Sequence, residues 1–360
     1  MKVKDFLYII DRIAPFQLAL DWDNSGLQVG NLESSVERAA LALDPSLPII
    51  CQAVAQGCQL LITHHPLIFK PLKTFDLSNP QAAQLAAAIS GSLAVISAHT
   101  NWDAKVVAEE LADLLQVERR RPLEDRWLKF LKVVVFVPES HEEAVRQAVL
   151  ASGAGTIGEY TDCFFKSNGL GGFKVPPDGR PFSGEPGLAH QTDEVRLEII
   201  TPINLMGLVD QAVRSVHPYE EPAFEFYELK TSGHGFGLIG SWDPPREAAP
   251  FLKAQLSSDG FWAGPKPGLV SSVALMPGSG GNYVQLAYKA GAQLLVSGEI
   301  THHQALLAEE LGLSVFAAGH FETERPGLDR LAGELANEFR HRQERVELIN
   351  LEEKSPFYRL

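Results

Sequence analysis

The stretch LLITHHPLIF, residues 60–69, joins a short apolar run to a pair of adjacent histidines. The apolar run at its start predicts a buried strand. Neighbouring side chains within a strand point to opposite faces of the sheet, so two histidines inside the strand would not share one task. At the end of a strand this alternation relaxes. We therefore place His64 and His65 at the end of the strand, where they can splay towards two points a few ångströms apart.

Further strand-like runs surround this stretch and alternate with helical patterns. RAALALD (38–44) comes before it, and LAVISAHT (93–100) comes after it. From about residue 238 the alternation resumes, and LLVSGEITHH in this block echoes LLITHH in the first. Strands that alternate with helices pair in parallel within α/β layers. The fold class we expect is therefore α/β, with two related half-domains, at 1–125 and 232–360, that form a layered core.

The pattern between these two blocks is different. A strong strand at 127–138 is followed by an amphipathic helix, and a strand, a helix and a strand end the segment near residue 230. Between them lies a Gly- and Pro-rich stretch, 166–189, which is too polar to be a core element. The βαββαβ-like order predicts a ferredoxin-like α+β module, inserted at 126–231.

The composition excludes several classes of partner. The chain has 45 acidic and 31 basic residues and a formal charge of −14, so it has no general attraction for nucleic acid or anionic membranes. The basic run Arg119–Arg121 is too short to change this, and we interpret it as a solvated helix end. No apolar run approaches the roughly 18 residues of a membrane span, and the 3 cysteines form no CxxC pair. We expect a cytoplasmic protein.

Histidines and carboxylates gather at the ends of the predicted strands. The carboxyl ends of parallel strands are where ligands bind in open α/β sheets. A lone histidine there is most often a packing residue, but four separate strand ends that carry histidines favour a metal site. The residues at these ends are His64 and His65, His99 and Asp103, His302 and His303, and His320 and Glu324.

Imidazole and carboxylate ligands indicate which ions fit. They suit divalent ions of the Zn, Mn, Fe or Ni type better than Mg or Ca. Two ions about 3.5–4 Å apart would need the splay expected of His64 and His65. Glu324 follows His320 by four residues, so a helix there would let the two side chains converge in its first turn. A set of about five protein ligands shared by two ions leaves positions open for water, as in catalytic sites.

Three further motifs each have a structural and a functional interpretation. HPYEEPA (217–223) is either a rigid turn or a second metal site made by His217 and a neighbouring glutamate. PGSGGN (277–282) is either a tight turn or a phosphate cradle at a helix N-terminus. DWDNSG (21–26) either caps the next element or lines the cleft.

Taken together, these motifs resemble a known family. DWDNSGLQVG, LITHHPLIF, SAHTNWD, GSGG, SGEITHH and GHFETERPG occur in this order over nearly the whole chain. In order and spacing they resemble the NIF-three-like proteins, also called GTP cyclohydrolase I type 2 homologues. The central HPYEEPA segment resembles the CutA/PII-like module that is inserted in the long bacterial members.

The resemblance implies a two-metal centre. Its ligands would be His64, His65, Asp103, His320 and Glu324, with His99 and His303 close by as groups that orient ligands, face the substrate or transfer protons. The resemblance also implies a homo-oligomer, a hexameric ring built as a trimer of dimers, with the metal sites facing an internal cavity. The chain departs from many members at Ser297-Gly298-Glu299, where they have Thr-Gly-Asp, and it adds Glu322 as a competing carboxylate.

Two classes of function follow from these expectations. The first is a metal-dependent hydrolase for a nucleotide-like, phosphorylated or cyclic small molecule, in which two ions generate hydroxide and His99 or His303 moves the proton. The second is a non-enzymatic metal-binding ring whose inserted module gates the cavity or senses a ligand. The open coordination positions expected of this ligand set favour the enzyme.

Overall fold

The computed structural model describes residues 1–126, 129–158, 160–179, 181–230 and 234–357. Contacts divide the chain into two compact units, one made of Met1–Arg126 with His234–Leu360 and the other of Trp127–Gly233. Among the described residues, the first unit contains two mixed sheets and the second contains one antiparallel sheet. None of the described helices is long and apolar enough to cross a membrane.

The first sheet is built around β3, the apolar run of the stretch quoted above. β2 and β4 run parallel to β3 on either side of it, β15 extends the sheet beyond β2, and β1 pairs antiparallel with β4. The strand bounds are β1 Gly26–Val29, β2 Arg38–Ala42, β3 Leu60–Thr63, β4 Ala94–Ser97 and β15 Glu347–Asn350. The pairing of β2, β3 and β4 confirms the parallel arrangement expected from the alternation.

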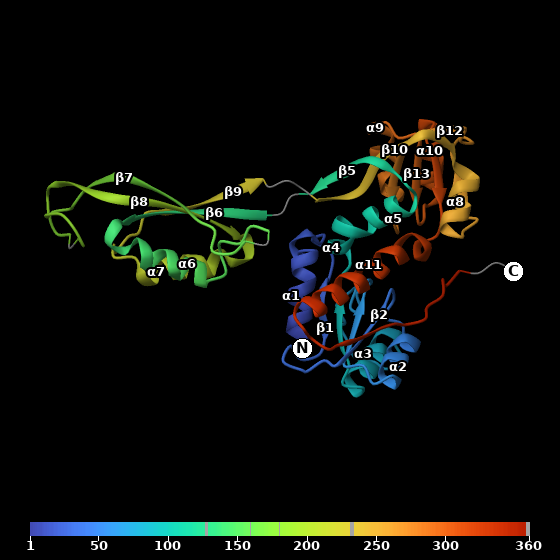
Figure 1. Cartoon of the computed structure of the whole chain (residues 1–360), viewed down its shortest axis with the longest axis horizontal. Coiled ribbons are helices and arrows are strands. Elements are labelled where there is room, and N and C mark those ends of the chain that lie inside the picture. The colour runs from blue at the N-terminus through green and yellow to red at the C-terminus, as the bar shows by residue number, and fades with distance from the viewer. Residues whose placement is uncertain (127–128, 159, 180, 231–233, 358–360) are drawn as a thin grey trace. The chain divides into compact units, whose positions relative to one another are not determined.

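Both faces of this sheet are covered, as continuous apolar strands require. Leu60 and Ile62 face a core that they share with α1 and α11, whereas Leu61 points the other way, into a core shared with α2 and α3. These helices are α1 Val3–Ile13, α2 Leu47–Ala55, α3 Pro80–Ser90 and α11 His320–His341 (Figure 1). Side chains therefore alternate between the two faces along β3, and His64 and His65 follow directly after the strand ends at Thr63.

The second sheet has the strand order β11-β14-β13-β12-β10-β5. β12, β13 and β14 are parallel, and the other strands pair antiparallel with their neighbours. The bounds are β5 Glu118–Arg126, β10 His234–Glu247, β11 Phe261–Ala263, β12 Leu269–Met276, β13 Leu294–Ser297 and β14 Ser314–Ala317, with helices α8 Ala248–Leu256, α9 Val284–Lys289 and α10 His302–Leu311. The carboxyl end of β14 leads directly into α11.

The two sheets exchange strands between the two halves of the sequence. β5 lies at the end of the first half but pairs with β10 of the second half, and β15 near the C-terminus pairs with β2. The interpretation of Arg119–Arg121 as a helix end is therefore wrong, because these residues lie in β5, where Arg121 pairs with Ile239. Each sheet thus contains strands from both expected half-domains, 1–125 and 232–360. The sequence did not predict this because pairing between distant strands leaves no local signal.

The helical segment after β4 joins the cores of the two sheets. It consists of α4 Thr100–Trp102, a π-helical turn Asp103–Val107 and α5 Ala108–Leu114. Trp102 and Val107 pack in the core of the first sheet, whereas Ala108 and Leu111 pack in the core of the second. A π-helical turn holds more residues than an α-helical turn and is frequent at functional sites. This turn begins at Asp103.

The inserted unit has its own core. Its strand order is β7-β8-β6-β9, and apolar residues of β6 and β8 pack against α6 and α7. The bounds are β6 Lys129–Pro138, α6 Glu142–Ala151, β7 Phe165–Lys174, β8 Ala189–Pro202, α7 Met206–Val216 and β9 Phe224–Lys230, and Figure 1 shows α6 and α7 on one side of the sheet. The order of elements is βαββαβ, as expected. The polar stretch 166–189 contributes to β7, which is a largely exposed strand.

Candidate metal centre

Strand ends from both halves of the sequence meet at one cluster of imidazoles and carboxylates. His64 and His65 follow β3, Asp103 begins the π-helical turn after β4, and His320 begins α11, with Glu324 one turn further along. The ligand atoms lie within 4.8 Å of one another in each of three groups: His64, His65 and His99; His65, His320 and Glu324; His64, Asp103 and Glu324. The structure thus brings together all the residues that the sequence predicted as metal ligands.

Glu324 lies at the centre of this cluster, and its two oxygens face different partners. Oε1 lies 3.0 Å from His320 Nε2 and 3.8 Å from His64 Nε2. Oε2 lies 3.2 Å from His65 Nε2. Asp103 Oδ1 lies 3.4 Å from His64 Nε2. Glu324 is therefore common to two sets of donors, one with His65 and His320 and the other with His64 and Asp103.

Each imidazole of the cluster has a partner at Nδ1. His64 Nδ1 lies 3.0 Å from the carbonyl oxygen of Ala98. The other three rings have carboxylate partners, with His65 Nδ1 2.9 Å from Asp44, His99 Nδ1 2.8 Å from Asp23 and His320 Nδ1 3.4 Å from Glu299. A partner at Nδ1 fixes the orientation and tautomer of the ring and makes Nε2 a better metal ligand. The four rings are therefore set to present Nε2 to the cluster.

The cluster contains buried polar atoms that the protein leaves unsatisfied. His64 Nε2, Asp103 Oδ1 and Glu324 Oε2 are buried and have no partner in hydrogen-bond geometry. Leaving such an atom unpaired is unfavourable by about 1–3 kcal/mol. Imidazole nitrogens and carboxylate oxygens that converge in this way are the donors that a divalent cation of the zinc type accepts. The residues present therefore fit a divalent metal ion.

The charges of the cluster depend strongly on one another. Burial raises the pKa of Glu324, but the neighbouring imidazoles outweigh it and hold that pKa well below its usual range. Burial lowers the pKa of His65, but the hydrogen bond to Asp44 and the neighbouring Glu324 carboxylate raise it to about 10. Burial raises the pKa of Asp103, and His64 offsets this only in part. The imidazoles and carboxylates thus stabilise one another's charged forms, and a metal ion that binds must displace any proton from its imidazole ligands.

A glycine lets the second half of the sequence approach the cluster closely. Gly278 has a φ of +63°, and a Cβ at this position would lie 2.2 Å from Glu324 Oε1. Its carbonyl oxygen accepts the N–H groups of Gly298 and Glu299 at 2.9 and 3.1 Å. PGSGGN is thus a tight turn packed against Glu324, as its structural interpretation proposed.

Asp23 of the DWDNSG motif lies behind the cluster. Its side chain is buried, and it accepts hydrogen bonds from His99 Nδ1 at 2.8 Å and from the Thr100 hydroxyl at 2.6 Å. Burial raises the pKa of Asp23, but these hydrogen bonds outweigh it and hold the pKa below its usual range. Asp23 therefore supports His99 from behind, and Trp22 of the same motif lines the cavity beside the cluster, as the functional interpretation of DWDNSG expected.

Sequence reasoning missed Asp44, the carboxylate that orients His65. Asp44 ends the run RAALALD, two residues after β2. A polar residue so close to the carboxyl end of a buried parallel strand was the available signal, since that edge of the sheet carries the site.

Two other predicted residues lie outside the cluster. His303 is exposed in the first turn of α10, and none of the metal-capable groups in the described part of the chain contains it. α10 begins with a capping box of Thr301 and Gln304, in which the Thr301 N–H donates to Gln304 Oε1 at 2.7 Å. Glu322 lines a neighbouring cavity together with Glu299. The proton-transfer role of His303 stays a prediction.

His217 of the HPYEEPA motif is engaged by the backbone of the inserted unit. Its Nε2 lies 3.0 Å from the carbonyl oxygen of Phe136, and its Nδ1 accepts the N–H of Tyr219 at 3.1 Å. Both ring nitrogens are therefore in use, which favours the rigid turn over the second metal site.

A cavity of about 540 Å³ opens beside the cluster. His99, Asp103, His320 and Glu324 contribute to its wall. The rest of the lining is mainly apolar or neutral and polar, and includes Trp22, Phe236, Met276, Asn282 and Tyr283. Glu124 also lines it, and the described lining contains no lysine or arginine. This volume is within the usual range for small-molecule sites, so a ligand in the cavity can touch the metal-facing groups.

Comparison with curated proteins gives close relatives over most of the chain. A Bacillus subtilis (strain 168) protein named "GTP cyclohydrolase 1 type 2 homolog" is 33% identical over 327 residues, which cover 88% of this chain and 88% of that protein. A protein of the same name from Listeria innocua is 32% identical over 326 residues, covering 88% of this chain and 87% of that protein.

Solved structures share the fold. The crystal structure of a Bacillus cereus protein related to NIF3 has a TM-score of 0.77 and 31% identity, and the match covers 100% of this chain and 99% of that one. A Staphylococcus aureus protein has a TM-score of 0.77 and 26% identity, with the same coverage. The model of the Duf34/NIF3 (NGG1p interacting factor 3) family matches residues 1–356. With a family match of this extent, the chain belongs to the Duf34/NIF3 family.

Proposed function

We propose that this protein binds two divalent metal ions and hydrolyses a small molecule in the adjacent cavity. The observation that carries the proposal is Glu324, which is shared by two sets of donors that include buried, unsatisfied atoms. The imidazole and carboxylate donors suit ions of the Zn, Mn, Fe or Ni type. When bound, such ions supply hydroxide at neutral pH and polarise the bond under attack.

The residues of the cluster have distinct roles under this proposal. His64, His65, Asp103, His320 and Glu324 would hold the ions, and Glu324 belongs to both sets of donors. His99 lines the cavity and has its Nδ1 bound to Asp23, so its Nε2 is the group placed to accept or donate a proton. We assign proton transfer to His99.

The substrate class is a nucleotide-like, phosphorylated or cyclic small molecule. No lysine or arginine occurs in the described lining of the cavity, so a phosphate there would be held by the metal ions. The faces of Trp22 and Tyr283 offer apolar area to the body of such a molecule. The printed name of the relatives, GTP cyclohydrolase 1 type 2 homolog, points to the same class of substrate.

Metal content tests the first half of the proposal. Protein should be purified without chelator and without affinity-metal resin, as wild type, Asp103→Ala and Asp113→Ala. Asp113 is a matched control because it lies on the same helical segment with an exposed side chain. We expect about two equivalents of metal per chain in wild type and control, as for a two-metal site, and clearly less in Asp103→Ala. Wild type that takes up no metal, even after reconstitution, would reject the site.

Turnover tests the second half. The metal-loaded protein should be assayed for hydrolysis of nucleotides, nucleoside monophosphates and cyclic phosphodiesters. Asp103→Ala should abolish turnover and leave the oligomeric state unchanged. Equal activity in the mutant would show that the cluster does not carry the reaction.

A regulatory function is the second candidate, and the compact inserted unit favours it. β5 and β10 pair at Arg126 and His234, so the chain ends left by deleting 127–233 can be joined by a short turn. Under this hypothesis the deletion removes the response to a ligand and keeps metal binding. An unchanged response would count against it.

The CutA/PII-like identity of the insertion and the hexameric ring stay predictions, and light scattering tests the ring.

A further inference from the structure

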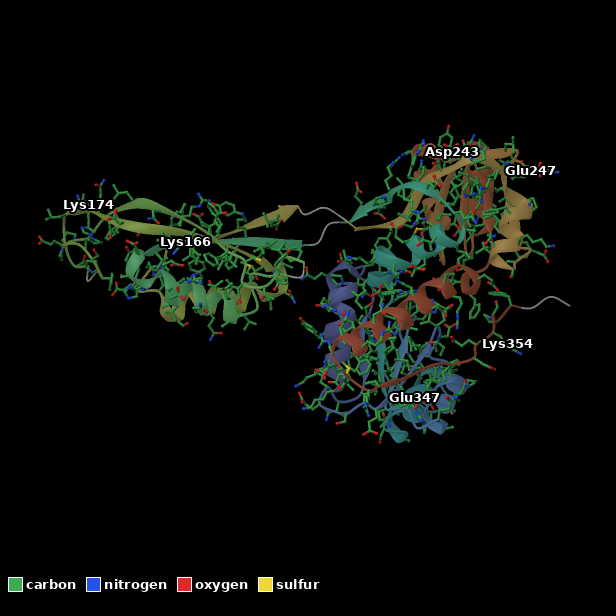
Figure 2. All side chains as sticks on the ribbon, in the orientation of Figure 1. Lys166, Lys174, Asp243, Glu247, Glu347 and Lys354 are labelled. Atoms are coloured by element: carbon green, nitrogen blue, oxygen red, sulfur yellow. The ribbon has the colours of Figure 1, made fainter. Side chains whose placement is uncertain are left out.

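The C-terminal tail passes close to the cluster, and one glutamate of the tail, Glu353, is buried there. Figure 2 labels Glu347 in β15 and Lys354 further along the tail. Leu351 is 2% exposed and packs with residues of α2 and α3. The side chain of Glu353 is only 6% exposed. A glutamate is almost never this buried unless it is paired, so its partners indicate what the tail does.

Glu353 binds the backbone that follows β2. The N–H of Leu43 donates to Oε2 at 2.5 Å, and the N–H of Asp44 donates to Oε1 at 2.9 Å. The pairing of β15 with β2 ends at Leu41, so the carboxylate replaces strand hydrogen bonds where the ladder stops. Hydrogen bonds to an ionised carboxylate are roughly twice as strong as those between neutral groups. Glu353 therefore fixes the position of Leu43 and Asp44.

Leu43 and Asp44 are also the residues that hold His65. The backbone N–H of His65 donates to the carbonyl oxygen of Leu43 at 2.9 Å. The Nδ1 of His65 lies 2.9 Å from Asp44 Oδ1. The side chain of Asp44 is 50% exposed, so packing does little to restrain it and its backbone anchor matters more.

Glu353 also contacts the helix that supplies the remaining ligands. The guanidinium of Arg325 lies 3.8 Å from Glu353 Oε2, and Arg325 directly follows Glu324 on α11. Glu353 thus contacts two segments that support the cluster. One is the backbone that holds His65, and the other is the helix that carries Glu324.

We propose that Glu353 is a positioning residue for metal binding, which holds His65 ready for a divalent ion through Leu43 and Asp44. This inference rests on the proposed metal site, but it concerns metal affinity and not turnover. Loss of a group that orients a metal ligand typically lowers affinity about 10–100-fold. We expect a loss of this size in Glu353→Ala.

Titration with Co²⁺ alone tests the proposal, because its absorption spectrum reports ligand geometry as well as affinity. The variants are Glu353→Ala, Glu353→Gln and Glu352→Ala, the last an exposed neighbour that serves as control. Glu353→Ala should bind Co²⁺ about 10–100-fold more weakly, with an altered spectrum. Glu353→Gln, which keeps one carbonyl oxygen, should recover part of the affinity. Wild-type affinity and spectrum in Glu353→Ala would overturn the proposal.

Two further variants separate positioning from a general loss of stability. Leu351→Ala removes a buried side chain of the tail but keeps the carboxylate, so it should lower the melting temperature and leave Co²⁺ affinity nearly unchanged. Asp44→Ala and Glu353→Ala act on the same imidazole, so their combined loss should be smaller than the sum of the single losses. A loss of affinity in Leu351→Ala equal to that of Glu353→Ala, or strictly additive losses in the double mutant, would overturn it.

The failure of this inference can be told apart from the failure of the proposed function. A wild-type protein that binds no Co²⁺ would overturn both, because there would be no site to position. If wild type binds Co²⁺ and Glu353→Ala binds it equally tightly, only the role of Glu353 is overturned.

Discussion

The tripeptide Thr-His-His occurs twice in this molecule, at residues 63–65 and 301–303, and the two copies have different structures. Thr63 is the last residue of β3, so the histidines after it enter the metal cluster directly. Thr301 comes four residues after the end of β13 and caps α10, so its histidines lie exposed on a helix. Distance from the strand end, and not the tripeptide, decides whether the imidazoles reach the site.

The threonine hydroxyls show the same contrast. The Thr63 hydroxyl is buried, donates to the carbonyl oxygen of His65 at 2.7 Å and lies 3.0 Å from Ser97 Oγ. It fixes the turn that splays the histidines. Thr301 forms a capping box with Gln304, a pattern that starts a helix. One threonine thus shapes the candidate metal centre, and the other starts a helix.

The largest difference between the copies should appear when one histidine of each is removed. His64→Ala deletes a buried donor of the cluster, whereas His302→Ala deletes an exposed side chain. Metal at a thousandfold above its Kd stabilises a fold by about 4 kcal/mol, so adding chelator should lower the melting temperature of wild type and His302→Ala. His64→Ala should show little response. Equal metal content in the two variants, measured by elemental analysis, would remove the distinction.

A glycine pair sharpens the comparison with a smaller effect. Gly278 and Gly312 both have positive φ, +63° and +74°, but only a Cβ at Gly278 would collide with Glu324. Gly312→Ala should lower stability by about 1–2 kcal/mol through backbone strain alone and leave metal affinity unchanged. Gly278→Ala should cause the same strain and also weaken metal binding, because Glu324 must move. Isothermal titration with Zn²⁺ measures the difference, and unchanged affinity in Gly278→Ala would contradict the close approach.

The smallest effects belong to the threonines, measured as free energies of unfolding in the metal-free protein. Thr63→Val removes a buried hydroxyl and its two hydrogen bonds, to the His65 carbonyl oxygen and to Ser97 Oγ, which should cost about 1–3 kcal/mol. Thr301→Ala removes a helix cap and should cost about 1 kcal/mol. Urea denaturation of both variants in excess chelator tests this order. A larger loss in Thr301→Ala would mean that the capped helix contributes more to stability than the turn beneath the cluster.

Local patterns in the sequence predicted those parts of the fold that depend on local residues. The apolar runs around Leu60 and Val95 gave correct strands, and the spacing of His320 and Glu324 gave a correct helical pair. Pairing between distant segments left no such pattern. β5 was therefore missed, and the role of Glu353 became visible only when the structure placed its carboxylate beside the end of β2.

The exposed position of the second histidine pair has a local cause. His303 was predicted to lie near the site because it follows a predicted strand and because the family resemblance implies it. The spacing of Thr301 and Gln304 is that of a capping box, and this local signal was present in the sequence. The helix that starts there leaves His302 and His303 exposed in its first turn.

The π-helical turn at Asp103–Val107 links the site to the core of the second sheet, and this limits which insertions and deletions the segment can accept. Each residue of a regular helix advances by about 100° around the axis, so a surplus residue offsets the two ends of the segment from one another. Asp103 at one end faces His64, and Leu111 at the other end packs in the core of the second sheet. Deleting one residue would restore a regular helix. Either Asp103 would then turn away from His64, or Leu111 would turn out of the core. A change in this segment therefore affects both the position of Asp103 in the cluster and the packing of Leu111 in the core.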